Sequence, residues 1–272
     1  MKKKIFKFLG LAMMAIFMLA CKKEEKLNVD LTKYNIDNPV SDTELDEWIR
    51  TTFLAPYNMD VIYRYNRYYY DNDKYVAPTD PSKIKAQMQT VLDGFITPYS
   101  KVAGATFIKR TLPKEWVLFG SPAYLNLKDN TVILASAAAG RRITLYSVND
   151  FNENDADAVT GKLRTIQHEY THILNQLVKM PVDFKNITAG TYDADWTEVP
   201  DATARDNGYV SPYASSSDVE DFAETVSMLL VRGQAWFDDR ANASTATGKA
   251  ALKEKEASIV QYFNINLGID FR

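Results

Sequence analysis

The sequence predicts an α+β domain in which a small sheet packs on one long helix and a helical part follows. Three observations lead to this fold class. Short strand-like runs alternate with helical patterns in the first half of the chain. One long helical pattern follows them, and the residues after 217 again have helical periodicity. The composition, 46% hydrophobic and 25% charged over 272 residues, is that of a folded domain.

The first twenty residues have the pattern of a secretory signal peptide. Four lysines, three of them consecutive, precede an uncharged apolar run from Phe8 to Ala20, which is too short to cross a bilayer as a helix. We therefore expect a signal peptide over residues 1–20, a polar tether over residues 21–40 and one folded domain over residues 41–272.

The cysteine Cys21 directly follows Met18-Leu19-Ala20, and the chain has no other cysteine. This pattern resembles the lipobox of bacterial lipoproteins, in which the cysteine is acylated, and the next residues, KKEEK, resemble an export tag of surface lipoproteins. The resemblance implies a lipid anchor in the outer membrane of a gram-negative bacterium, with the protein exposed on the cell surface. Beyond residue 20 the chain holds 28 basic and 35 acidic residues, which argues against a nucleic-acid partner.

The domain is expected to begin with a helix over 41–54, where Ser41 to Glu44 form a capping-box pattern. A tyrosine-rich segment over 61–70 predicts a half-buried strand, with a sugar-stacking platform as the functional alternative. The other expected elements are a helix over 82–96, strands over 115–119, 131–135 and 142–148, and helices over 156–178, 217–232 (stopped by Gly233) and 246–265.

Both histidines of the chain belong to one motif, Gln167-His168-Glu169-Tyr170-Thr171-His172. Histidines at i and i+4 share a helix face and can bind one cation. Glu169 is offset so that it can reach a water molecule activated by zinc and act as general base. The expected core stripe of this helix lies on another face: Leu163, Ile166, Tyr170, Ile173, Leu174 and Leu177.

A catalytic zinc ion needs a third protein ligand, and no histidine remains to supply it. The helix over 217–232 carries Glu220 and Glu224 on one face, beside an apolar stripe. We predict that Glu220 is the third ligand and that Glu224 holds a ligating imidazole through its other N–H. Asp221 and Glu224 are the competing ligands.

The motif with a downstream glutamate resembles the gluzincin branch of zinc metallopeptidases, and Glu220-Asp221-Phe222-Ala223-Glu224 resembles the second helix of the lethal-factor-type peptidases. In those enzymes a tyrosine seven residues before the ligand glutamate faces the metal and stabilises the oxyanion. That position is Tyr213 here, with Tyr209 as the nearby alternative.

With the lipobox, the whole chain resembles the substrate import-associated zinc metallohydrolase lipoproteins, which accompany outer-membrane import transporters. The resemblance implies a zincin-like catalytic domain over 41–272, one Zn²⁺ ion, and hydrolysis of a peptide or amide substrate. It also implies an edge strand that binds extended substrate, for which 142–148 is the first candidate and 131–135 the second. Two alternatives stay open: a zinc hydrolase of a non-peptide substrate, and a non-catalytic ligand-binding lipoprotein of an import system.

Overall fold

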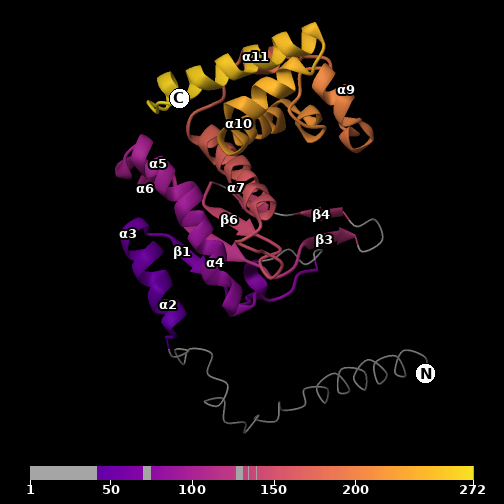
Figure 1. The fold of residues 1–272 in the computed structure, drawn as a ribbon. Helices are drawn as coiled ribbons and strands as arrows, with labels where there is room; N and C mark the ends of the chain where they lie inside the picture. Colours follow the sequence, from indigo (N-terminus) through magenta and orange to yellow (C-terminus); the bar gives the residue numbers. More distant parts are fainter. Residues whose placement is uncertain (1–41, 70–74, 127–130, 134, 139, 272) are drawn as a thin grey trace, which may run out of the picture. The chain divides into compact units, whose positions relative to one another are not determined.

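The chain folds into a small mixed sheet, a separate hairpin and a larger set of helices, which confirms the α+β prediction (Figure 1). The computed structural model describes residues 42–69, 75–126, 131–133, 135–138 and 140–271. The predictions made for the signal peptide, Cys21 and the tether lie outside these residues. Residues 43–272 form one compact unit.

The main sheet has four strands in the order β1-β2-β6-β5. Their bounds are β1 Asp60–Ile62, β2 Glu115–Leu118, β6 Arg142–Leu145 and β5 Ala135–Ala138. β2 is parallel to both β1 and β6, whereas β5 is antiparallel to β6. The expectation that residues 142–148 form an edge strand is therefore wrong, because β6 lies between β2 and β5.

The second edge candidate, residues 131–135, is divided between two sheets. β4 (Thr131–Ile133) pairs with β3 (Ala123–Asn126) in an antiparallel hairpin, and Ala135 begins β5. β5 is thus an edge strand of the main sheet, and it packs against the long helix that follows β6.

The two faces of the main sheet contact different clusters of apolar side chains, as the period of two along a strand requires. Trp116, Leu118 and Ile143 point into the main core, and Val117 contributes to a second, smaller cluster. Tyr69 packs on that second cluster. The predicted strand over 61–70 is accordingly short, because after Ile62 the chain leaves the sheet and covers its second face.

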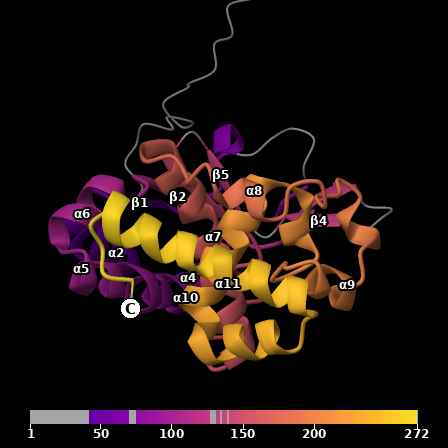
Figure 2. The same ribbon diagram turned by 90° about the horizontal axis from the view of Figure 1, so that it is seen from above.

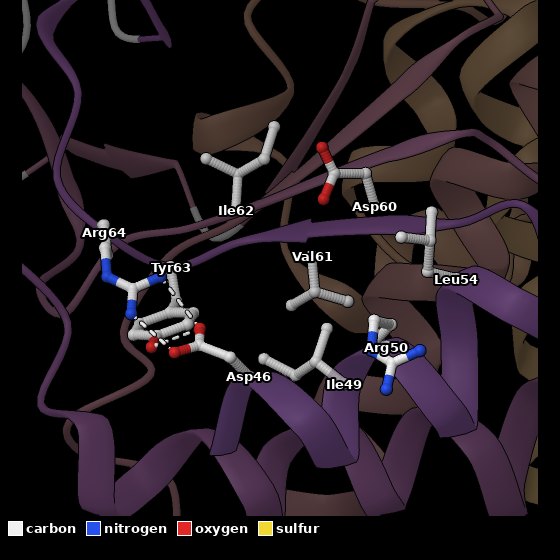
Figure 3. A pocket seen from close by; sticks show the side chains of 9 residues that line it. All are labelled: Asp46, Ile49, Arg50, Leu54, Asp60, Val61, Ile62, Tyr63 and Arg64. Carbon is white, nitrogen blue, oxygen red and sulfur yellow. Dashed lines mark hydrogen bonds and ion pairs between the residues drawn. The ribbon is translucent and has the colours of Figure 1, made fainter. Parts of the chain in front are cut away.

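The N-terminal helices begin at side-chain caps. Thr43, rather than Ser41, caps α2 (Glu44–Ile49), and Asp46 completes the capping box. Asp46 also accepts hydrogen bonds from the Tyr63 hydroxyl and the Arg64 guanidinium, which joins α2 to the end of β1 (Figure 3). The remaining α-helices before the long helix are α3 Ala55–Tyr57, α4 Pro81–Val91, α5 Thr97–Val102 and α6 Ala105–Thr111, and π-helical turns over Arg50–Leu54 and Leu92–Ile96 continue α2 and α4.

The long helix α7 (Ala156–Leu177) lies between β5 and the helix α10 (Asp218–Asn242), and α11 (Ala246–Gln261) packs on α10 (Figures 1 and 2). Two short α-helices lie between α7 and α10 in the chain, α8 Phe184–Ile187 and α9 Asp201–Asp206. Gly233 interrupts α10 with a φ of 80°, after which the chain resumes a helix to Asn242. Among the described residues, no helix is both long and apolar enough to span a membrane.

Candidate metal centre

Helix α7 carries three of the predicted site residues. Its first turn is capped by Asp155, whose side chain accepts from the backbone N–H of Asp157 at 2.9 Å. The buried side chains of the predicted stripe pack α7 into the core, although Leu177 is 59% exposed at the end of the helix. His168 is buried and His172 half-buried on the face turned toward α10, as a spacing of four residues requires.

Helix α10 supplies the carboxylates. Ser217 caps it by accepting from the backbone N–H of Glu220, so the predicted third ligand lies in the first turn. Phe222 and Val226 are fully buried in the core, which fixes the face of α10 that carries Glu220 and Glu224 against α7. The packing of the two helices thus brings together residues that lie about fifty positions apart in the chain.

The ring nitrogens of both histidines and one carboxylate oxygen converge on a single point. Nε2 of His168 lies 2.9 Å from Oε2 of Glu220 and 3.0 Å from Nε2 of His172. The remaining separation, from Nε2 of His172 to Oε2 of Glu220, is 3.3 Å. Tetrahedral zinc with bonds of about 2.0–2.1 Å places neighbouring ligand atoms about 3.3 Å apart. The donor types and their spacing therefore fit a zinc ion.

Glu224 contacts the other nitrogen of the first histidine. Its Oε1 lies 3.0 Å from Nδ1 of His168, and its Oε2 accepts a hydrogen bond from Ser211 at 2.9 Å and one from Arg164 at 3.2 Å. This carboxylate, 3% exposed, is positioned to hold the imidazole so that Nε2 faces Glu220. Of the competing ligands, Glu224 is directed to Nδ1, and Asp221 pairs with Lys255 on the far side of α10.

The charges of this cluster shift the pKa values of its members. Burial opposes protonation of His168, but its hydrogen bond to Glu220 and the adjacent Glu224 carboxylate outweigh burial and raise its pKa to about 9 in the metal-free protein. Burial likewise opposes ionisation of Glu220, yet the two histidines hold its pKa well below the usual range. In the metal-free protein Glu220 therefore stays ionised around neutral pH while His168 carries a proton, which a cation bound at Nε2 would displace.

Glu169 is half-buried on α7 between the two histidines. Its negative charge contributes to the raised pKa values of both His168 and Tyr213, which places the carboxylate close to the ligand group. A carboxylate so placed can exchange a proton with a molecule bound at the point where the ligand atoms converge.

The structure distinguishes between the two candidate tyrosines. The ring of Tyr213 lies 5.7 Å from that of His168, centroid to centroid, and burial and the negative charge of Glu220 raise the pKa of its phenol well above the usual value. Its phenol is thus a hydrogen-bond donor at the site. Tyr209, by contrast, is fully buried in the core, and its hydroxyl lies 2.7 Å from that of Thr191.

Three residues near the site were not predicted. Arg164 lies one turn before His168 on the same face of α7. Helical spacing therefore places its guanidinium near Glu224, the carboxylate that contacts His168. Ser211 and Trp196 come from the loop-rich stretch 180–216, where no periodicity signals a contact. The Trp196 ring packs edge-on against the ring of Tyr213, with 4.9 Å between centroids, and Tyr213 in turn faces His168.

Comparisons with known proteins agree with this geometry. Residues 38–272 match the protein family described as "Putative zinc-binding metallo-peptidase". The chain is also similar to a solved structure from Bacteroides caccae ATCC 43185, described as a putative zinc-binding metallo-peptidase. The two share 27% sequence identity with a TM-score of 0.69, over 83% of this chain and 86% of the other. A comparison with curated proteins finds no match.

Proposed function

The chain belongs to the family described as "putative zinc-binding metallo-peptidase", and from this premise we propose that it is a zinc-dependent hydrolase of peptide or amide bonds. The observation that carries the proposal is the convergence of the His168, His172 and Glu220 ligand atoms, with Glu169 beside them. A zinc-binding protein without catalysis would not need a carboxylate and a protonated phenol beside the ligand group.

In this proposal His168, His172 and Glu220 bind one zinc ion. When bound, zinc supplies Lewis-acid polarisation and lowers the pKa of water. Glu169 removes a proton from the attacking water molecule and later delivers it to the leaving amine, as one carboxylate can do in successive steps. Glu224 orients His168 through Nδ1, so that the Nε2 lone pair faces the other ligands.

Tyr213 is proposed to donate a hydrogen bond to the substrate carbonyl oxygen as negative charge develops on it. Its raised pKa keeps the proton on the phenol, and its neighbours His168 and Glu220 place it at the ligand group. One such preorganised donor stabilises a transition state by about 3 kcal/mol in comparable acyl-transfer enzymes.

We propose a zincin-like arrangement for substrate binding, in which an extended peptide adds to the free edge of β5. Within the described residues β5 pairs only with β6, on the side away from this edge, and it packs against the helix that carries both histidines. The strand reads Ala135-Ser136-Ala137-Ala138, and an extended peptide would bind its edge through main-chain hydrogen bonds.

The cellular setting is a proposal that the N-terminal sequence pattern alone supports. Acylation at Cys21 would anchor the protein in the outer membrane of a gram-negative bacterium, exposed on the surface and next to an import transporter. Cys21→Ala is then expected to move the protein from the membrane fraction to the soluble fraction on cell fractionation. A variant that stays in the membrane fraction would contradict the lipid anchor.

Incubation of the zinc-loaded chain from residue 22 with a peptide library, read by mass spectrometry, tests the activity. We expect cleavage that stops when a chelator removes zinc and returns when zinc is restored. Peptidoglycan fragments and glycan amides are incubated in parallel as alternative substrates, in a second arm of the experiment. Cleavage confined to that arm would assign the site to a non-peptide substrate, and no cleavage in either arm would contradict the hydrolase.

A further inference from the structure

A fully buried lysine lies behind the candidate metal centre. Nζ of Lys255 on α11 is 2.6 Å from Oδ2 of Asp221 and donates to the backbone carbonyl of Gly208 at 2.8 Å. Neither charged side chain of the pair has any exposed surface. Removing two charges from water costs several kcal/mol per ion, so a pair of this kind is weak evidence of stabilisation. Its position in the fold suggests another use.

Asp221 joins the lysine to the helix turn that carries the third ligand. It follows Glu220 directly in the first turn of α10, and side chains of consecutive helical residues point about 100° apart. Glu220 therefore faces α7 while Asp221 faces α11. Asp221 also accepts hydrogen bonds from Tyr192 at 3.0 Å and Thr225 at 3.2 Å. Holding this carboxylate from the α11 side restricts the rotation of the first turn of α10 about its axis.

Gly208 joins the same lysine to the segment that carries two other site residues. The backbone of Gly208 has a φ of +89°, and a Cβ atom here would lie 2.6 Å from Cβ of Ala251 on α11. The segment therefore lies directly against α11. It continues to Ser211, which donates to Glu224, and to Tyr213, which faces His168.

We propose that Lys255 is a positioning residue of the metal centre, because it fixes the first turn of α10 through Asp221 and the segment 208–213 through Gly208. The inference rests on the proposed function, since it assigns a role relative to the zinc ligands. Lys255 acts from the opposite side of α10, and its cation also lies 4.1 Å from the centroid of the ring of Tyr209, the residue that follows Gly208 in that segment.

Zinc affinity of the chain from residue 22, measured by competition with a chelator well below the unfolding temperature, tests this role. Lys255→Met is expected to raise the zinc Kd about tenfold, the lower end of the loss seen when residues that orient metal ligands are replaced. Thermal unfolding of the metal-free protein is recorded in parallel. The matched control is Lys253→Met, on the same helix but paired with Asp238 and Glu256, for which the zinc Kd is expected to be unchanged.

A double variant separates positioning from stability. Lys255→Met with Asp221→Asn leaves no unpaired buried charge, so its thermal stability should approach that of the wild type while its zinc Kd stays raised. Recovery of both quantities would overturn the inference, as would wild-type affinity in Lys255→Met. A wild-type chain that fails to bind zinc would instead contradict the proposed function, and this inference with it.

Discussion

Replacing Glu224 by alanine separates a residue that orients a ligand from a residue that is a ligand. The Glu224 side chain is 3% exposed, contacts Nδ1 of His168 at 3.0 Å and accepts from Ser211 and Arg164. Loss of such an orienting carboxylate lowers metal affinity about 10- to 100-fold, or roughly 1.4 to 2.7 kcal/mol. Glu220→Ala removes a ligand atom itself, so we expect a loss well beyond that range.

The assay is competition for zinc with a chelator of known affinity, at one fixed pH, on proteins shown to be folded by circular dichroism. Glu224→Ala is also expected to lower the free energy of unfolding, because Ser211 and Arg164 lose a buried acceptor at about 1–3 kcal/mol per unmade hydrogen bond. If Glu224→Ala lowers the zinc affinity more than Glu220→Ala does, the reasoning is refuted and Glu224 is the ligand.

Three further outcomes are expected. Glu169→Gln should keep the wild-type zinc Kd and lose about 10²- to 10⁴-fold in initial rate, and retained turnover would exclude it as general base. Tyr213→Phe should lower kcat about 10²-fold with unchanged zinc Kd, whereas Tyr209→Phe, away from the ligand group, should leave kcat unchanged; equal effects would contradict the assignment. The hydrogen bond from Arg64 holds the pKa of Asp46 below its usual range, so its contribution to stability is present above about pH 4 and is lost as the pH falls further. Urea unfolding of Asp46→Asn should therefore show a weaker loss of stability between pH 5 and pH 3 than the wild type. If the free energy of unfolding falls equally with pH in both proteins, Asp46 is not a source of the acid sensitivity (Figure 3).

Features that depend on short stretches of chain were predictable. The spacing of His168 and His172, and that of Glu220 and Glu224, places each pair on one helix face whatever the rest of the fold does. The composition also left few nitrogen and sulfur ligands for a zinc site, since the chain has two histidines and one cysteine. The α+β class followed from the same local patterns, and the structure confirms it.

Features that depend on pairing between distant segments were not predictable. β5, Ala135–Ala138, has neither branched side chains nor polar alternation, so the usual strand signals are absent, and its edge position depends on pairing with β6. The expected edge role of 142–148 failed for this reason. The Lys255–Asp221 pair was not predictable either, because the residue types alone do not distinguish a buried charged side chain from an exposed one.

The central claim is that His168, His172 and Glu220 together bind one zinc ion. Anomalous diffraction from crystals of the zinc-loaded protein, recorded on both sides of the zinc absorption edge, tests it most directly. The account predicts one zinc peak per chain, about 2.0–2.2 Å from Nε2 of each histidine and from a Glu220 carboxylate oxygen. A peak bound by Asp221 or Glu224 in place of Glu220, or no peak between α7 and α10, would contradict it.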